Sequence, residues 1–503
     1  MKFPTFADLD QDQRRVYSES PQDKGVLIVG PPGSGKTVLA MHRATRLSKS
    51  GDVIVGMFNK TLRQYTSNFE GLPKNVKVVH IHEWAKEWYE SAFGKGSFPT
   101  TYGKPWEINW AKIDQNITSA TDTQKSKLHW GHLIIDEGQD FPKKMYVTLM
   151  NYLNNQKDPT ITLSVFADEN QTITDVNSTI SEIRTEINAT ARNMRYWRVD
   201  KNYRNTKEVA KFARHFQVLG AGTVSLPDHE GIKPVVFVNK DLNSQIQHIA
   251  NYCNVQTNKE VGVVVFGANK DVKFVYTAIK ATLDSNQSKY HVQTYIGKNT
   301  FKLNDWESLK FDKPPSITII HQANSKGLEF DVVFVINLAG LYLRAGNEID
   351  GFKKLYVVSS RPREHLFFMV EGSPDNGGFK DVLRLFPNHN DNESLCTYKT
   401  LEKDLQDPIL EDMLNDVDWL PSASTVARQL YGELAKKLSE LNIDKTKQII
   451  IEAVSGQFEY GHIPQLINDR LSEANNIEES ILDTLVELNN FSIKEIKDKV
   501  GLS

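Results

Sequence analysis

The chain has 503 residues, more than one ordinary domain, and its content of 39% hydrophobic and 24% charged residues is typical of a globular protein. No apolar run approaches the ~20 residues of a membrane span, and the first residues lack a signal-peptide core, so we expect a cytoplasmic protein without a membrane segment. Only Cys253 and Cys396 occur, which excludes a disulfide framework and a cysteine-based zinc site.

Charge is distributed unevenly along the chain, although its net value is only −3. Residues 401–503 carry 10 Lys and Arg against 20 Asp and Glu, whereas residues 1–400 carry the other 50 against 43. The first 400 residues are therefore mildly basic, which permits contact with a phosphate backbone, and the remainder is acidic.

The earliest strong signal is a strand, a glycine-rich loop and a helix in direct succession. Val26 to Val29 form an apolar run typical of a buried parallel strand. Residues 30–37 read GPPGSGKT and fit the pattern GxxxxGK[ST], and apolar residues at helical spacing follow. This order predicts a phosphate-binding loop.

Each residue type in this loop has a physical role. Gly33 and Gly35 let the backbone curl so that its N–H groups point at phosphate oxygens, and the helix N-terminus adds partial positive charge. Lys36 is expected to reach the β- and γ-phosphates and the Thr37 hydroxyl to hold Mg²⁺. The predicted cofactor-binding residues of the loop are Gly30, Gly33, Ser34, Gly35, Lys36 and Thr37.

Two further strands are expected at residues 53–58 and 76–81, followed by a small aromatic insertion at about 89–130. Three aromatic residues of this insertion could stack on nucleic-acid bases, although core packing is the commoner fate of a tryptophan. They are Tyr89, Trp106 and Trp110. Both interpretations stay open from the sequence.

Paired carboxylates come next, in the segment HLIIDEGQD at residues 132–140. Asp136 and Glu137 follow an apolar run, which places them at the carboxyl end of a strand, where open α/β sheets bind ligands. An acid there can hold Mg²⁺, and its neighbour can deprotonate the attacking water. The following strand, at 161–166, leads to Gln171, which can sense a γ-phosphate.

A second α/β pattern begins at about Tyr196. Helical segments alternate with strands expected at 234–238, 261–267, 291–295, 316–322, 332–338 and 365–370. This alternation implies a second parallel sheet. It carries no phosphate loop of its own, so we expect it to contribute arginine to the nucleotide across a cleft.

The remainder of the chain changes to a helical, acidic pattern. Two apolar stripes are expected, one of Leu430, Leu434, Leu438 and Leu441 and the other of Ile477, Ile481, Leu485 and Leu488. Ser492 and Glu495 form a capping box for a last helix. The predicted domains are residues 1–195 with the insertion at about 89–130, residues 196–400, and a helical extension at 401–503.

The ordered set of motifs resembles the UvrD/Rep-type superfamily 1 helicases. The set runs over roughly residues 5–372 in family order and comprises Gln13, GPPGSGKT, IIDEGQD, DENQ, NYRNT, SKGLEF and YVVSSRPR. The resemblance implies an α/β fold of two RecA-like parallel-sheet domains with ATP and Mg²⁺ in the cleft between them. The large accessory insertion of the second domain is missing, so the chain resembles a compact form.

The resemblance also assigns the nucleotide contacts. Gln13 resembles the adenine-reading glutamine, Tyr203 the base-stacking aromatic, and Glu329 the residue that touches the ribose. Lys36 and Thr37 match the phosphate-loop pair.

Catalytic roles are implied in the same way. Asp136 matches the magnesium ligand and Glu137 the general base, while Gln171 resembles the γ-phosphate sensor. Arg204 resembles the γ-phosphate arginine and Arg361 the arginine finger.

The nucleic-acid contacts resemble the family less closely. Asn59, Lys60 and His82 lie in segments similar to those that grip single-stranded DNA. However, the aromatic and the arginine that follow the sensor glutamine in the family are absent from residues 173–178. Other departures are Val38, His321 and Ala323, at positions where the family often has arginine, threonine and histidine.

These predictions describe an ATP-dependent helicase or translocase on single-stranded nucleic acid, with DNA favoured and RNA left open by the sequence. The missing aromatic–arginine pair motivates an alternative, an ATPase switch that senses nucleic acid or a partner without unwinding, as in a DNA-repair or phage-defence complex. In a second alternative, residues 401–503 are a docking module that recruits an effector such as a nuclease. The competing interpretation is that this segment only packs on the second domain.

Overall fold

The computed structural model describes most of the chain. The described residues are 4–57, 72–156, 158, 160–168, 178, 180–188, 195–218, 225–239, 241–296, 309–311, 313–341, 348–372, 379–391, 393–401, 407–455, 467, 471, 476–487, 496, 497, 499 and 500. They form two compact units: residues 1–204 with 223–225 and 306–312, and residues 205–222, 226–305 and 313–503.

The first unit is built on a six-stranded parallel sheet in the order β3-β2-β6-β7-β1-β8. Its strands are β1 (Val26–Val29), β2 (Val53–Met57), β3 (Val76–His80), β6 (His132–Ile135), β7 (Thr162–Ala167) and β8 (Arg195–Arg198). Most are short and apolar because both faces of the sheet are covered by helices.

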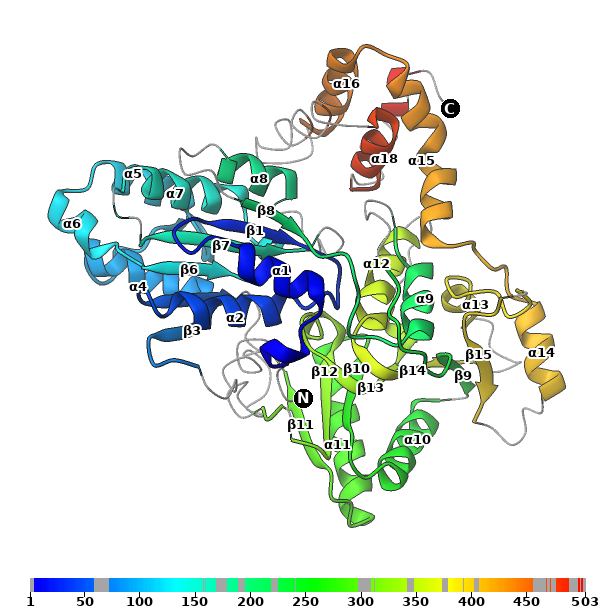
Figure 1. The fold of residues 1–503 in the computed structure, drawn as a ribbon. Helices are drawn as coiled ribbons and strands as arrows, with labels where there is room; N and C mark the ends of the chain where they lie inside the picture. Colours follow the sequence, from blue (N-terminus) through cyan, green and yellow to red (C-terminus); the bar gives the residue numbers. More distant parts are fainter. Residues whose placement is uncertain are drawn as a thin grey trace. The chain divides into compact units, whose positions relative to one another are not determined.

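Helices lie on both faces of this sheet, and Figure 1 shows α2 and α7 on opposite sides of it. The helices are α1 (Gln11–Glu19), α2 (Lys36–Leu47), α4 (Ile81–Phe93), α5 (Trp110–Thr118), α6 (Asp122–Lys127), α7 (Lys143–Asn154) and α8 (Ile180–Asn188). Leu133 and Ile135 of β6 pack in one core with residues of α4, α5 and α7, as expected for alternating strand residues that face the same side.

The insertion expected at 89–130 contains the hairpin β4 (Thr100–Thr101) and β5 (Lys104–Ile108) together with α5 and α6. Tyr89 and Trp110 are buried in the core of the first unit, 2% and 3% exposed. Core packing is therefore confirmed for these two residues, and base stacking by them is wrong. The Trp106 side chain lies outside the described residues.

The second unit contains a seven-stranded parallel sheet in the order β11-β12-β10-β13-β14-β9-β15. Its strands are β9 (Val235–Asn239), β10 (Glu260–Val265), β11 (His291–Tyr295), β12 (Ser316–His321), β13 (Phe330–Ile336), β14 (Pro362–Glu371) and β15 (Thr397–Thr400). The expected strands are all present with small shifts of their ends, whereas β15, a short edge strand, was not anticipated.

Helices α10 (Leu242–Val255) and α11 (Asn269–Ser285) cover one face of this sheet, and α9 (Lys207–His215) and α12 (Glu348–Ser359) lie on the other face (Figure 1). Short α13 (Phe379–Leu383) and α14 (Asp407–Asn415) follow. Two parallel-sheet α/β units confirm the predicted fold class.

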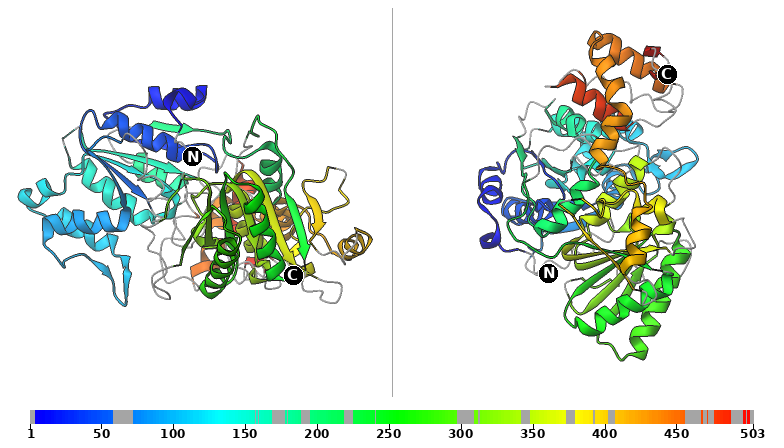
Figure 2. Two further views of the ribbon diagram at one scale, coloured as in Figure 1. Left: turned by 90° about the horizontal axis from the view of Figure 1, so that it is seen from below. Right: turned by 90° about the vertical axis from the view of Figure 1, so that its right-hand side faces the viewer.

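The last described helices are α15 (Ala423–Ser439), α16 (Ile443–Ser455) and α18 (Ile477–Glu487), and α15 and α18 lie side by side (Figure 2). The predicted stripes are correct only in part. Leu434, Leu438, Ile481 and Leu485 are buried, but Leu430 and Ile477 are 44% and 40% exposed. Leu488 and the Ser492–Glu495 capping box lie outside the described residues.

One expected boundary differs from the structure. The second domain was placed from residue 196, but β8 pairs in parallel with β1 and the first unit extends to Arg204. The reason is that β8 completes the edge of the first sheet, a long-range pairing that its polar sequence does not indicate. Within the described ranges, every helix is too short or too polar to cross a membrane.

Candidate nucleotide-binding site

The phosphate loop leaves the carboxyl end of β1 and ends at α2, for which Gly35 is the N-cap residue. Gly33 and Gly35 both have left-handed backbone, with φ of +78° and +81°. A Cβ at Gly33 would lie 2.5 Å from Asn202 Oδ1, and one at Gly35 would lie 2.4 Å from Gln13 Nε2. Only glycine fits these two positions, because conformation and space both exclude a side chain.

Lys36 is the first residue of α2, and its side chain is 7% exposed. Its Nζ donates to the carbonyl oxygens of Gly30 and Pro31, at 2.7 and 2.8 Å, and to Asp168 Oδ2 at 3.2 Å. A buried ammonium group needs such partners. The loop therefore holds the lysine against its own backbone, beside the end of β7.

Thr37 and Asp136 meet although they are far apart in the sequence. The Thr37 hydroxyl donates to Asp136 Oδ2 at 2.7 Å. Burial raises the pKa of Asp136 to about 7, helped by the charge of Glu137 and opposed by the Thr37 hydrogen bond and by Lys36. Among the residues that the structure describes, none forms a hydrogen bond with Asp136 Oδ1, although this atom is buried. An oxygen atom without a partner, next to a hydroxyl, fits a hard cation such as Mg²⁺.

Glu137 follows Asp136 with left-handed backbone, φ 53°, which is uncommon for a residue with a side chain. Gln139 Nε2 donates to Glu137 Oε2 at 2.6 Å, and Gln139 Oε1 accepts from the backbone N–H of Asp168 at 2.9 Å. Gln139 is 1% exposed. It therefore links the predicted general base to the end of β7, a link that sequence reasoning missed because the glutamine was seen only as part of a motif.

The predicted nucleobase residues Gln13 and Tyr203 both donate to backbone carbonyl oxygens of the phosphate loop. Gln13 Nε2 donates to the carbonyl oxygen of Ser34 at 3.1 Å. The backbone N–H of Tyr203 donates to the carbonyl oxygen of Gly33 at 2.8 Å, and the Arg204 N–H donates to Asn202 Oδ1 at 2.9 Å. A Cβ at Gly33 would lie 3.1 Å from Arg204 Cβ, so the structure brings Gln13, Tyr203 and Arg204 to the phosphate loop.

Two of these residues belong to a different unit from the one that the sequence predicts. Tyr203 and Arg204 were assigned to the second domain, but both belong to the first unit. Because β8 runs parallel to β1, the segment that follows β8 emerges at the same edge of the sheet as the phosphate loop. The expectation that Arg204 comes from the second half is therefore wrong.

The second unit brings its own two predicted residues together. Glu329 directly precedes β13 and Arg361 directly precedes β14, and the Phe330 N–H donates to the carbonyl oxygen of Arg361 at 3.3 Å. Within this unit, Arg361 Nε donates to the carbonyl oxygen of Val357 at 2.8 Å. Its Nη2 donates to Ser360 Oγ at 2.8 Å.

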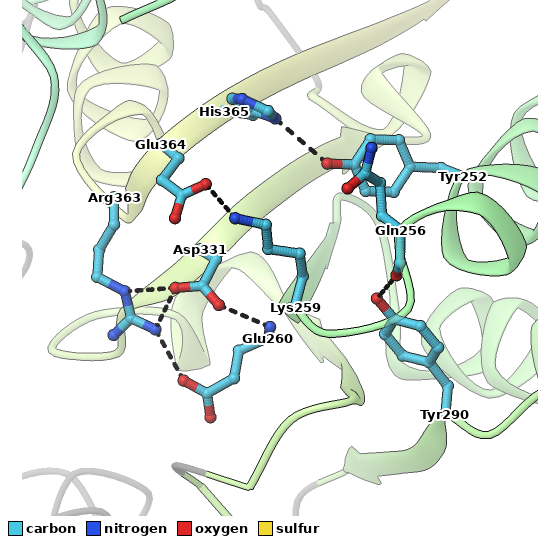
Figure 3. A network of polar contacts seen from close by, with 9 residues as sticks. All are labelled: Tyr252, Gln256, Lys259, Glu260, Tyr290, Asp331, Arg363, Glu364 and His365. Carbon is cyan, nitrogen blue, oxygen red and sulfur yellow. Dashed lines mark hydrogen bonds and ion pairs between the residues drawn. The ribbon is translucent and has the colours of Figure 1, made fainter. Parts of the chain in front are cut away.

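A polar network fixes this edge of the second sheet (Figure 3). Arg363 Nη2 lies 2.7 Å from Glu260 Oε2 and 2.8 Å from Asp331 Oδ1. Asp331 Oδ2 accepts from the Glu260 N–H at 2.8 Å, and Lys259 pairs with Glu364. These residues stand at the amino ends of β10, β13 and β14, so the turn that carries Arg361 is anchored two residues away. No pattern in the sequence indicates a role for Arg363.

Gln171, Asn59 and Lys60 lie outside the described residues. His82 lies in the first turn of α4, half-buried, with its ring 5.3 Å from that of His80. Its assignment to nucleic acid stays a prediction.

Comparison with known proteins supports the first unit as a nucleotide-binding domain. Residues 13–177 match the family model described as "AAA domain". The match contains the phosphate loop and the carboxylates Asp136 and Glu137, so this part of the chain is a P-loop NTPase domain.

Curated relatives are distant and much longer. Cytoplasmic dynein 2 heavy chain 1 from Mus musculus, Rattus norvegicus and Homo sapiens is 29% identical over 103 residues, 20% of this chain. The chain spans only 2% of the length of these relatives.

Among solved structures, the C-terminal domain of a possible DNA helicase from Lactobacillus (strain WCFS1) aligns with 19% identity and a TM-score of 0.26. The alignment covers 40% of this chain and 99% of that domain. The sequence identity and the TM-score are both too low for this likeness to indicate a function.

Proposed function

We propose that the chain is an ATP-dependent helicase or translocase that acts on single-stranded nucleic acid, with DNA as the favoured substrate and RNA as the alternative. The observation that carries the hydrolase part is the meeting of Thr37 with Asp136, beside Lys36, at the carboxyl edge of one parallel sheet. The helicase part rests on the resemblance to UvrD/Rep-type proteins and on the second parallel-sheet unit. The sequence of this unit contains no second GxxxxGK[ST] pattern.

In this proposal, Thr37 and Asp136 hold Mg²⁺, which when bound neutralises charge on the β- and γ-phosphates. Lys36 exchanges its loop carbonyls for phosphate oxygens. Glu137 accepts the proton of the attacking water, and Gln139 keeps its carboxylate in place.

Arginine supplies the remaining charge in the proposal. Arg204 lies beside the phosphate loop in the first unit, and Arg361 is carried by the second. An arginine acting on the γ-phosphate accelerates hydrolysis by about 10³–10⁵-fold in well-studied NTPases, or about 4–7 kcal/mol. Use of Arg361 from a separate unit would couple hydrolysis to movement between units.

Hydrolysis is tested by comparing Glu137→Gln with the wild type in steady-state turnover and in equilibrium binding of a fluorescent ATP analogue. We expect the variant to bind the analogue as the wild type does. Its turnover should fall below a tenth of the wild-type rate, because general-base catalysis typically contributes about 10²–10⁴-fold. Glu87→Gln, an exposed carboxylate in α4, is the matched control. Turnover above that level would contradict the assignment of Glu137.

Nucleic-acid dependence is tested with the same assay on single-stranded DNA, duplex DNA and RNA at several salt concentrations. Displacement of streptavidin from a biotinylated strand then reports movement. Stimulated hydrolysis with displacement supports a translocase, whereas stimulation without displacement supports the ATPase switch. No stimulation by any nucleic acid would contradict the nucleic-acid part of the proposal.

A further inference from the structure

The side-chain amide of Asn205 is bonded to the backbone on both sides of Arg361. Its Nδ2 donates to the carbonyl oxygen of Pro362 and, over a longer distance of 3.5 Å, to that of Ser360. Asn205 is 1% exposed, and all four residues belong to the second unit. A carboxamide nitrogen carries two hydrogens, so one side chain can bond to both carbonyl groups.

The strand β14 begins irregularly at this turn. Phe330 of β13 pairs with Pro362, whereas Val332 pairs with His365, so β14 has one residue more than β13 over this stretch. An extra residue of this kind disrupts the hydrogen-bond ladder locally. The Asn205 amide therefore fixes the backbone at the point where the ladder is disrupted.

The Arg361 guanidinium takes its position from the same turn. Its Nε donates to the carbonyl oxygen of Val357 at 2.8 Å, and its Nη2 donates to Ser360 Oγ at 2.8 Å. Ser360 Oγ in turn donates to the carbonyl oxygen of Val357 at 2.9 Å. Because the guanidinium is bonded to this backbone, a shift of the turn moves the charged group with it.

Asn205 also stands where the chain passes from the first unit to the second. Arg204 is the last residue of the first unit at this point, and a Cβ at Gly33 of the phosphate loop would lie 3.1 Å from its Cβ. On the other side, Thr206 is the N-cap of α9, and its hydroxyl accepts from the Val209 N–H at 3.4 Å. The backbone of Asn205 is thus held from both directions, which gives its amide a fixed origin.

We propose that Asn205 is a positioning residue for the arginine of the second unit: its amide ties the turn at 360–362 to the peptide bond that joins the two units, and so determines where Arg361 can reach. This inference rests on the proposed role of Arg361 in hydrolysis. Asn205 acts through the turn rather than on the nucleotide itself. The competing interpretation is that Asn205 only satisfies two buried carbonyl groups.

A double-mutant cycle separates positioning from a contribution to stability alone. Asn205→Ala removes both donor hydrogens, and it is made in the wild type and in an Arg361→Ala background. Asn205→Ser keeps one hydroxyl donor on a smaller side chain. Asn254→Ala, at an exposed position in the last turn of α10, is the matched control.

Single-turnover hydrolysis of radiolabelled ATP, equilibrium binding of a fluorescent ATP analogue and thermal unfolding are measured for every variant. We expect Asn205→Ala to slow hydrolysis about 10–100-fold, since a displacement of about 1 Å costs up to this factor. Affinity for the analogue should change little, because the phosphate loop belongs to the first unit. In the Arg361→Ala background, Asn205→Ala should slow hydrolysis less than about two-fold further, because the group that it positions is gone.

An unchanged rate in Asn205→Ala, or an equal fold-loss in both backgrounds, would overturn the role of Asn205. A failure of the proposed function gives a different result, in which the wild type hydrolyses no ATP or Arg361→Ala keeps the wild-type rate. If Asn205→Ala does not fold, Asn205→Ser is compared in the same two backgrounds. We expect a loss of about three- to ten-fold for it in the wild type, the scale of one hydrogen bond, and again almost none in Arg361→Ala.

Discussion

Replacement of Gln139 by leucine gives a direct test of how the predicted general base is held. The side chain is 1% exposed and makes two hydrogen bonds, to the Glu137 carboxylate at 2.6 Å and to the Asp168 N–H at 2.9 Å. Loss of the first removes a bond to a charged group, about 1.5–3 kcal/mol, and loss of the second leaves a buried N–H unsatisfied, about 1–3 kcal/mol. Burial of the leucine offsets about 1 kcal/mol of this cost.

The free energy of unfolding should therefore fall by about 3 kcal/mol, which lowers the melting temperature by roughly 6–12 °C. Because the Glu137 carboxylate also loses its neighbour, kcat should fall about 10–100-fold, part of the range that general-base catalysis contributes. KM for ATP should change little, since the two side-chain hydrogen bonds of Gln139 go to Glu137 and Asp168 rather than to residues of the phosphate loop.

Single-turnover hydrolysis of radiolabelled ATP and thermal unfolding are measured on the same preparation. Gln115→Leu, at an exposed position of α5, is the matched control and should change neither quantity. A variant that is destabilised as expected but keeps kcat within two-fold of the wild type would show that Gln139 stabilises the first unit without positioning the base.

Two further predictions concern backbone conformation and pH. Gly35→Ala should weaken binding of a fluorescent ATP analogue at least about ten-fold, because φ is +81° and the new Cβ would lie 2.4 Å from Gln13 Nε2; wild-type affinity would contradict this. Burial lowers the pKa of His215 to about 4. The hydrogen bond with the carbonyl oxygen of Leu385 acts in the opposite direction but is the smaller effect. The unfolded chain therefore binds the proton first, and His215 contributes stability that is present above about pH 6.5 and is lost as the pH falls towards about 4, by roughly 3 kcal/mol in all. His215→Gln should flatten this dependence in urea unfolding at pH 7 and pH 5, and an unchanged slope would refute the assignment.

Most strands and the phosphate loop could be predicted from the sequence because their signals are local. The loop at residues 30–37 combines glycines with a flanking strand and helix, so its conformation follows from neighbouring residues. Asp136 and Glu137 follow an apolar run directly, and the structure places Asp136 against Thr37. In each case, the residues that carry the pattern also form the element.

The sequence was a weaker guide where contacts with distant parts of the chain decide the local structure. The strand β8 has the sequence RYWR, which lacks an apolar run, and it forms because the edge of β1 is available to it. Leu430 and Ile477 fit helical stripes but are exposed. Helical periodicity shows which residues share a face of the helix. It does not show how much of that face another element covers.

The sequence by itself determined the two parallel-sheet units, the phosphate loop and the residue types of the nucleotide site, since strand periodicity and glycine-rich turns depend on near neighbours. Only the tertiary structure decided that Tyr203 and Arg204 belong to the first unit, that Asn205 is bonded to the backbone beside Arg361, and that Gln139 joins Glu137 to Asp168. These contacts depend on which strands become neighbours in the sheet, and strand order is set by packing over the whole unit rather than by any local pattern.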